Sequence, residues 1–310
     1  MSAGELDGRV AIVTGAGRGL GRAYALALAG AGGAVVVNDV DDEAARETVE
    51  AIRAGGGDAW AVLAPVGPSE TAQQLVESAV SRFGRLDALV TNAGVLRDGV
   101  LWKMSDEAFD EVITTHLRGT FTCARAAAIQ MRDQGEGGRI IVIGSPAGQH
   151  GNFGQTNYGA AKAGVVAFAR IWSLELARSA ITVNAVIPTA WTRMTAAIPI
   201  YAPVAEALAE GEPLPATLRR EHGIGMPEDC AALVVFLASD AGRQITGQAI
   251  GIGGDRLTLY SHPAELAVRV RDGGWDLAAI AAAWSDHFAA LAQPSGITLP
   301  PLDLGGGERE

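Results

Sequence analysis

Short runs rich in Val, Ile and Thr alternate with longer helical stretches along most of this chain, and this alternation constrains its fold more than any other feature. Strands that alternate with helices form βαβ units, and successive βαβ units build a parallel sheet. The runs are continuously apolar, which is the pattern of strands covered by helices on both faces. We predict strands over residues 10–14, 35–39, 59–63, 88–91, 139–143, 182–187 and 249–252.

The predicted fold class is α/β: a single doubly wound, Rossmann-type parallel sheet flanked by helices, over residues 7–254. Ligands of such sheets bind at the carboxyl ends of the strands. Residues 188–226 form a connection long enough to be a substrate lid, and a helix is expected to open after it at Pro227. Residues 255–310 form a helical extension, which we expect to pack on the domain or on a partner subunit. Its apolar stripe consists of Leu277, Ile280, Trp284, Phe288 and Leu291.

The composition excludes several classes of protein. The chain has 310 residues, 48% of them hydrophobic, which is enough for a sizeable core. Its net charge of −11, from 24 basic and 35 acidic residues, does not suit a nucleic-acid partner. Cys123 and Cys230 have apolar neighbours and are predicted to be buried thiols. No signal peptide or membrane-spanning run is visible, so we expect a cytoplasmic protein that binds a small molecule.

A glycine-rich turn follows the first predicted strand and opens a helix, with the sequence Thr14-Gly-Ala-Gly-Arg-Gly-Leu-Gly21. Glycines let the backbone turn tightly and approach a pyrophosphate, and the helix N-terminus offers free N–H groups and a positive dipole end. A turn that merely ends a strand can also be rich in glycine. The position between a strand and a helix favours dinucleotide binding.

Asp39 ends the second predicted strand, about 20 residues beyond the glycines. A carboxylate at this position can accept hydrogen bonds from the adenine-ribose hydroxyls, and it would repel the extra phosphate of NADP. The alternative is an Asp that caps the next helix. Arg18 in the glycine turn could instead favour a phosphate. Together these residues predict NAD as the cofactor, with no metal.

Tyr158 and Lys162 are four residues apart, so on a helix their side chains share one face. A phenol is a poor base at neutral pH, but a nearby ammonium lowers its pKa. The pair can then exchange a proton with an alcohol or a carbonyl oxygen. Ser145, at the end of the fifth strand, can hydrogen-bond the same oxygen. Taken singly, the pair could be a surface pair, and Ser145 could be a turn residue before Pro146.

The order and spacing of these motifs resemble the short-chain dehydrogenase/reductase family over roughly residues 7–254, including Asn92-Ala93-Gly94 after the fourth strand. The resemblance implies that Tyr158 is the acid/base, that Lys162 lowers its pKa and holds the nicotinamide ribose, and that Ser145 orients the substrate. It implies hydride transfer between the nicotinamide and a secondary alcohol or ketone. The implied cofactor-binding residues are Gly15, Arg18, Gly19, Leu20, Gly21, Asp39, Val66, Asn92, Ala93, Gly94, Tyr158, Lys162, Pro188 and Thr192.

A narrower resemblance is to the dehydrogenase unit of the peroxisomal multifunctional enzyme type 2 and to its stand-alone actinobacterial relatives. It implies NAD-dependent oxidation of a lipophilic substrate such as a (3R)-hydroxyacyl-CoA or a hydroxysteroid. The tail with Trp284 is similar to that unit's extra C-terminal segment. The segments that carry the resemblance are 22–27, 35–39, 96–98, 116–119, 151–155 and 192–195.

Three positions depart from the family pattern. His116 stands where most members have an Asn that anchors a water in the proton relay, so it is either a relay group or a core-facing helix residue. Pro65 replaces an Asp that contacts adenine in the family. Only the backbone near Val66 is then left to contact the adenine. Pro188 is followed by Thr189 rather than by Gly.

We expect a homodimer or homotetramer. The competing functions are an NAD-binding sensor or scaffold without turnover, and a structural oligomer component.

Overall fold

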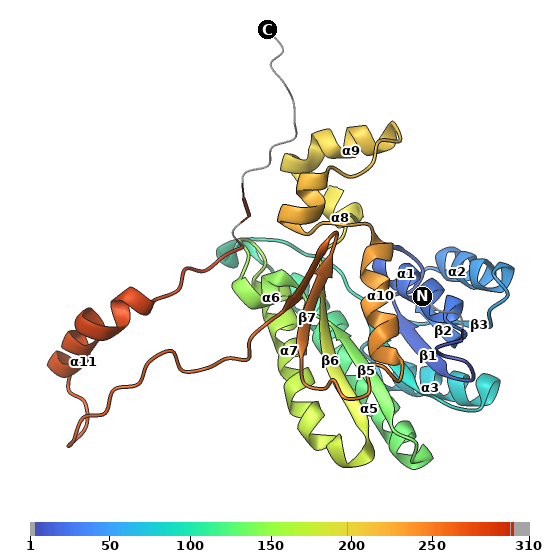
Figure 1. Ribbon diagram of the computed structural model, residues 1–310, viewed down its shortest axis with the longest axis horizontal. Helices are drawn as coiled ribbons and strands as arrows, with labels where there is room; N and C mark the ends of the chain where they lie inside the picture. Colours follow the sequence, from blue (N-terminus) through green and yellow to red (C-terminus); the bar gives the residue numbers. More distant parts are fainter. Residues whose placement is uncertain (1–3, 197, 298, 301–310) are drawn as a thin grey trace, which may run out of the picture.

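The computed structural model describes residues 4–196, 198–297 and 299–300. Its centre is an eight-stranded sheet in the order β3-β2-β1-β4-β5-β6-β7-β8 (Figure 1). Strands β1 to β7 are parallel, and β8 runs antiparallel to β7. The strands are β1 Val10–Thr14, β2 Ala34–Asp39, β3 Ala59–Leu63, β4 Ala88–Thr91, β5 Gly138–Ile143, β6 Ile181–Pro188, β7 Ala249–Gly253 and β8 Arg256–Leu259.

The predicted fold class is confirmed, and each of the seven predicted strands is present within one residue of its predicted bounds. Strand β8 was not predicted. It lies inside the segment that the sequence assigned to the extension, so the sheet continues past residue 254. Its four residues are mostly exposed and include Arg256, so the segment lacks the apolar run that marks the other strands.

Helices cover both faces of the sheet, and each face has its own hydrophobic core. In β1, Ala11 and Val13 point into one core with α1, α2 and α10, whereas Val10 and Ile12 point into the other with α3, α5 and α7. The main helices are α1 Gly19–Gly30, α2 Asp42–Ala54, α3 Ser69–Phe83, α4 Asp106–Val112, α5 Gly119–Gln134, α6 Pro146–His150, α7 Thr156–Glu175 and α10 Pro227–Ala238.

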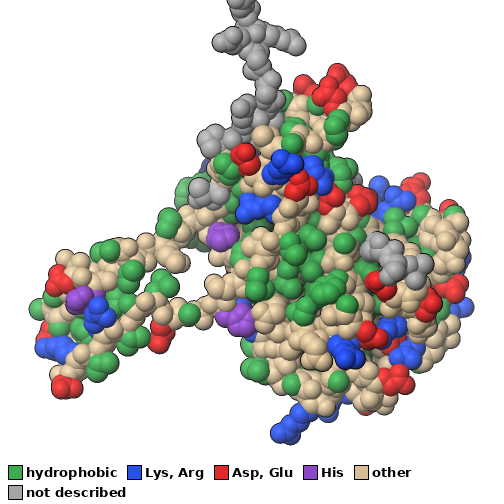
Figure 2. All heavy atoms as spheres, in the orientation of Figure 1, with side chains coloured by type: hydrophobic (Ala, Val, Ile, Leu, Met, Phe, Trp, Pro, Cys, Tyr) green, Lys and Arg blue, Asp and Glu red, His purple; other side chains and the backbone are tan. Residues whose placement is uncertain are grey.

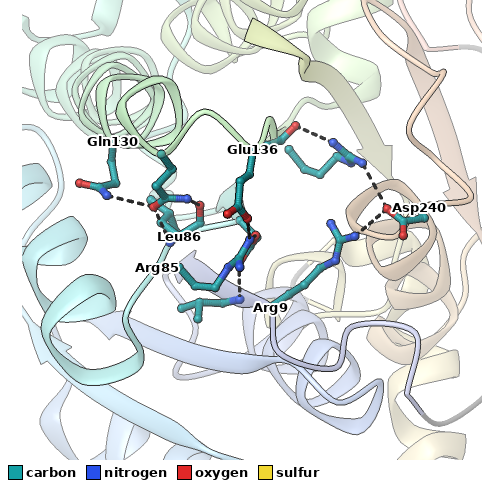
Figure 3. A network of polar contacts seen from close by, with 11 residues as sticks. Arg9, Arg85, Leu86, Gln130, Glu136 and Asp240 are labelled. Atoms are coloured by element: carbon teal, nitrogen blue, oxygen red, sulfur yellow. Dashed lines mark hydrogen bonds and ion pairs between the residues drawn. The ribbon is translucent and has the colours of Figure 1, made fainter.

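The amino ends of the strands are closed by a network of charged and polar side chains (Figure 3). Asp87 accepts hydrogen bonds from Val10 N, at 2.9 Å, and from the Arg85 guanidinium, which also pairs with Glu136 at 2.7 Å. Arg9 pairs with Asp240 at 2.6 Å. These groups satisfy one another, so the opposite, carboxyl edge of the sheet is the one left for a ligand.

Two segments project from this layered body (Figure 1). The predicted lid, 188–226, contains α8 Arg193–Ala196 and α9 Ala202–Ala209, and the helix expected at Pro227 follows it as α10. Beyond β8, the chain forms an arm with α11 Leu277–Ala283 at its tip. Cys123 and Cys230 are free and buried, as predicted. Among the described residues, no helix combines the length and apolar character that crossing a bilayer requires.

Candidate active site

The glycine turn between β1 and α1 leaves no room for a side chain at Gly15 or Gly21. A Cβ on Gly21 would lie 2.0 Å from Gly15 O, and one on Gly15 would lie 2.7 Å from Ala93 Cα. Gly15 and Gly19 also have positive φ angles, of 62° and 52°. The turn therefore keeps bare backbone at the start of α1, which is what a dinucleotide pyrophosphate requires. Leu20 lies in the first turn of that helix.

Asn92 and Ala93 support this turn through hydrogen bonds to Thr14 and Gly15. The Asn92 side-chain amide donates to Thr14 O at 3.1 Å and to Gly15 O at 3.0 Å. The backbone N–H groups of Asn92 and Ala93 donate to Thr14 Oγ1 at 3.0 and 3.1 Å. The segment after β4 thus fixes the loop after β1.

The Asp39 carboxylate lies against the glycine turn. Its Oδ2 accepts from Gly17 N at 2.8 Å, and its Oδ1 accepts from Val40 N and Asp41 N at 2.8 and 3.1 Å. The residue that caps α2 is Asp41, which accepts from Ala44 N at 3.1 Å. The alternative that Asp39 caps the next helix is therefore wrong, because the N-cap of α2 is Asp41.

Arg18 forms an ion pair with the residue that caps α2. Its guanidinium lies 2.6 Å from Asp41 Oδ2, and both side chains are about half exposed. Val66 lies at the same end of the site, three residues beyond β3, where its side chain packs against Gly119. Pro188 is the last residue of β6. Thr192 lies four residues further on, at the start of the lid.

Ser145, Tyr158 and Lys162 come together at the carboxyl end of β5. Ser145 is the N-cap of α6, and Tyr158 and Lys162 lie on α7. The two helices approach closely because of Gly148, where a Cβ would lie 2.6 Å from the backbone of Lys162. Lys162 Nζ donates to Ile143 O at 2.6 Å and lies 5.7 Å from the centre of the Tyr158 ring.

Burial controls the protonation of this cluster. Removal from water raises the pKa of Tyr158 above its usual value, and a hydrogen bond to Ser145 opposes that shift. Burial lowers the pKa of Lys162 to about 7. Lys162 is itself desolvated and donates to Ile143 O, and the expectation that it lowers the pKa of Tyr158 stays a prediction.

His116 is buried beside this cluster, on a π-helical segment, Ile113–Arg118, between α4 and α5. Its ring lies edge-on to Tyr158, with 5.1 Å between centroids. Its Nε2 lies 3.0 Å from Val95 N and 2.8 Å from Val95 O, so it accepts from one or donates to the other. Its Nδ1 is buried without a hydrogen-bond partner. Burial and the charge of Lys162 lower its pKa to about 3, so the imidazole is neutral.

Asn157 is a site residue that the sequence reasoning missed. It is fully buried, its amide donates to Arg97 O and Ala108 O, both at 3.0 Å, and its Oδ1 accepts from Tyr158 N at 2.7 Å. It thereby ties the start of α7 to α4 and to the loop that carries Val95. Its place next to Tyr158 was the only sequence signal that pointed to it.

The segment predicted as the lid has a small hydrophobic core of its own. Tyr201 and Leu208 pack in this core, within the lid itself. A segment this long must cover its own apolar residues before it can cover a ligand. Ile198 and Ile200 are exposed. The residues of the lid core are Tyr201, Val204, Leu214, Leu218 and Ile224, with Trp191 and Leu208 packed against them.

The fold and the cluster define an oxidoreductase, and comparison with known proteins gives its family. Residues 9–199 match the short chain dehydrogenase family, and the chain belongs to it. Its relatives are named as dehydrogenases and reductases, and the chain is an enzyme of this kind, acting on CH–OH groups. Members of the family use a nicotinamide dinucleotide. The glycine cradle and Asp39 of this chain fit such a group.

Two relatives and one solved structure illustrate the similarity. The chain is 41% identical over 298 residues to hydroxyacyl-CoA dehydrogenase ChsB1 of Mycobacterium tuberculosis, covering 92% of this chain and 90% of that protein. It is 43% identical over 257 residues to a 3-oxoacyl-(acyl-carrier-protein) reductase of Synechocystis, covering 80% of this chain and 97% of that one. A short chain dehydrogenase from Mycobacterium avium matches with a TM-score of 0.80 and 35% identity, over 94% of this chain and 98% of that one.

Proposed function

We propose that this enzyme interconverts a secondary alcohol and a ketone with NAD, on a lipophilic substrate such as a 3-hydroxyacyl-CoA or a hydroxysteroid. The observation that carries the proposal is the meeting of Ser145, Tyr158 and Lys162 beside the glycine cradle. A sensor or scaffold needs only the nucleotide half of this arrangement. The clustered Ser145, Tyr158 and Lys162 side chains argue for turnover instead.

The proposed chemistry divides between the cofactor and the chain. Bound NAD supplies the acceptor for the hydride of the carbinol carbon. Tyr158 Oη takes the hydroxyl proton in oxidation and returns it in reduction, while Ser145 Oγ hydrogen-bonds the same oxygen. Lys162 holds the nicotinamide ribose and favours the phenolate when Tyr158 is deprotonated. Water must be excluded for this proton transfer to be efficient, and the burial of Lys162 beside the half-buried Tyr158 supports that condition.

His116 is proposed as the next group in the proton path. Its unpartnered Nδ1 is buried close enough to Lys162 for the ammonium to lower its pKa. A neutral imidazole can accept a proton at one nitrogen and donate at the other. The alternative is that His116 is purely structural and is held in place by its hydrogen bond to the Val95 backbone. His116→Asn should keep most of the activity and His116→Leu should lose it; equal activity in both variants contradicts the relay.

The choice of NAD is supported by Asp39 and by the position of Arg18. The 2′-phosphate of NADP would lie close to the Asp39 carboxylate, and two negative charges close together repel each other. The guanidinium that could offset the repulsion is already paired with Asp41. Wild-type enzyme is therefore expected to show a higher kcat/KM with NAD than with NADP.

The lipophilic substrate is supported by exposed apolar residues next to the catalytic helices. Gly99 N donates to Gly154 O at 2.8 Å, so the loop before α4 lies beside the loop between α6 and α7. These loops carry Trp102 and Phe153, which are 77% and 85% exposed. The M. tuberculosis relative, named for a hydroxyacyl-CoA, aligns over more of this chain than the acyl-carrier-protein reductase does.

A steady-state screen tests this proposal. We would measure kcat/KM with NAD for short- and long-chain (3R)-hydroxyacyl-CoAs and for hydroxysteroids, and in reverse for a 3-oxoacyl-carrier protein. Apolar burial contributes about 25 cal/mol per Å², so kcat/KM should rise with chain length. Equal values for short and long chains would refute the lipophilic substrate. A preference for the carrier protein would move the proposal to that substrate class.

A further inference from the structure

Asn157 is a polar side chain that is completely buried at the start of α7, next to Tyr158. Figure 2 shows charged side chains spread over one face of the molecule, where water solvates them. A buried amide has no such access to water, and an unsatisfied donor or acceptor on it would be costly. Even when it is satisfied, its net contribution to stability is small. The partners of Asn157 therefore show what this side chain contributes.

The two amide hydrogens and the carbonyl oxygen of Asn157 bind three different backbone groups. Its Oδ1 accepts from Tyr158 N at 2.7 Å, and its amide donates to Arg97 O and to Ala108 O, both at 3.0 Å. The donors and the acceptor of an Asn lie in one rigid plane. These bonds therefore fix three backbone segments relative to one another.

The bond to Tyr158 N holds the part of α7 that carries the catalytic phenol. The first N–H groups of a helix have no partner within the helix. Gln155, the N-cap residue of α7, makes no side-chain bond to them. Asn157 Oδ1 supplies an acceptor at Tyr158 itself, so the backbone of the catalytic residue is held in one orientation.

The other two bonds lead to the segments that hold His116. Ala108 lies on α4, which continues directly into the π-helical segment that carries His116. Arg97 lies two residues beyond Val95, whose backbone N and O lie 3.0 and 2.8 Å from His116 Nε2. Asn157 is therefore bonded to Tyr158 and to both segments that place the imidazole.

The imidazole has little room to follow a displaced phenol. The rings of His116 and Tyr158 lie 5.1 Å apart at an interplanar angle of 87°. A Cβ on Gly94 would lie 2.2 Å from His116 Cε1, so the ring already packs tightly against bare backbone. Misplacing a reacting group by about 1 Å can lower a rate roughly 100-fold. The distance between the two rings is thus a quantity that the fold must control.

We propose that Asn157 is a positioning residue for proton transfer, which holds Tyr158 in place relative to His116 and to the substrate oxygen. It is completely buried and acts through Tyr158, so it is not itself a catalytic residue. The inference rests on the proposed function, because it takes Tyr158 as the acid/base. The competing role is purely structural, in which the three bonds only stabilise the packing of α4 against α7.

Steady-state kinetics of Asn157→Ala and of a matched control separate the two roles. Asn184 in β6 is a similarly buried amide, which donates to Ile245 O at 2.7 Å and accepts from Gln248 N at 3.1 Å. Both alanine variants leave buried backbone groups without a partner, so both should lower the Tm. Asn157→Ala should lower kcat about 10- to 100-fold and leave KM and the Kd of NADH within about threefold. Asn184→Ala should keep kcat within about twofold.

The solvent isotope effect on kcat identifies the step that slows. If Asn157 positions the proton donor, proton transfer limits the rate of Asn157→Ala, and its kcat should fall more in deuterium oxide than that of wild type. Asn184→Ala should show the wild-type isotope effect. The proposal is overturned if the two variants have equal kcat, or if Asn157→Ala is slow but keeps the wild-type isotope effect.

Fluorine NMR follows the Tyr158 ring without any turnover. The chain has four tyrosines, so 3-fluorotyrosine labelling gives few signals, and Tyr158→Phe identifies the signal of Tyr158. This signal should shift and broaden in Asn157→Ala and stay at its wild-type position in Asn184→Ala. A Tyr158 signal that Asn157→Ala leaves unchanged overturns the proposal.

Asn157→Asp keeps the test decisive should Asn157→Ala fail to fold. The Asp side chain has the same size and still accepts from Tyr158 N, but once ionised it cannot donate to Arg97 O or Ala108 O. It should show the same loss of kcat. Wild-type kcat in Asn157→Asp, beside a low kcat in Tyr158→Phe, overturns this inference alone. Wild-type kcat in Tyr158→Phe overturns the proposed function, and this inference with it.

Discussion

At the scale of single residues, Asp39 and its neighbours form the proposed cofactor site with very few atoms. One carboxylate accepts three backbone N–H groups and still lies beside the glycine turn. Two residues on, Asp41 caps α2 and also holds Arg18. The proposed ribose site is therefore acidic, and the Arg18 guanidinium beside it is paired with Asp41.

Asp41→Asn should make the enzyme more tolerant of NADP. Asn still caps a helix well, but it releases Arg18, which can then bind a 2′-phosphate. We expect kcat/KM with NADP to rise about tenfold, equivalent to ~1.4 kcal/mol, while that with NAD changes little. Asp42→Asn is the matched control, since it removes the same charge from a pair with Arg46. A similar gain in the control would assign the effect to net charge alone.

His116 should make the fold sensitive to acid. Its pKa is lowered to about 3 in the folded protein, so between there and about 6.5 the unfolded chain binds more protons. Stability is therefore lost as the pH falls through that window, by about 2 kcal/mol from pH 7 to pH 5. Thermal unfolding at both pH values should show a smaller loss in His116→Asn than in wild type. The exposed His287→Asn should behave like wild type, and an unchanged loss in His116→Asn contradicts the account.

At the scale of elements, the lid behaves as a unit with its own core. Leu218 is completely buried in that core, apart from the two cores of the sheet. Leu218→Ala should therefore loosen the lid locally, raising KM for long substrates severalfold, with a Tm close to that of wild type. Leu28→Ala, equally buried but under α1, should cost about 2–5 kcal/mol of global stability. A large fall in Tm for Leu218→Ala would show that the lid is part of the main core.

The elements that the sequence predicted well are those whose signal is local. The parallel strands are continuous apolar runs, and Tyr158 and Lys162 share a helix face because of their spacing alone. Strand β8 was not predicted from the sequence, because a short, exposed edge strand has no such apolar run. The bond from Lys162 to Ile143 O, the raised pKa of Tyr158 and the π-helical turn at His116 depend on burial between distant elements, so no local pattern carries them.

At the scale of the whole molecule, the two ends of the sheet strands carry different groups. Ion pairs close the amino ends of its strands, and the carboxyl ends carry the cofactor cradle and the acid/base cluster. The arm is the part of the described chain that this layered plan leaves uncovered. Its helical stripe was visible in the sequence, but spacing alone shows that a face is apolar, not what covers it.

The central claim is that Tyr158 transfers the proton of an NAD-dependent alcohol oxidation. The direct measurement compares wild type with Tyr158→Phe in kcat, on the best substrate found, and in the dissociation constant of NADH by fluorescence. The ring still packs without its hydroxyl, so NADH binding should stay within about threefold, while kcat falls by about 10²–10⁴. A variant that keeps more than a tenth of wild-type kcat, with NADH binding intact, would contradict the account.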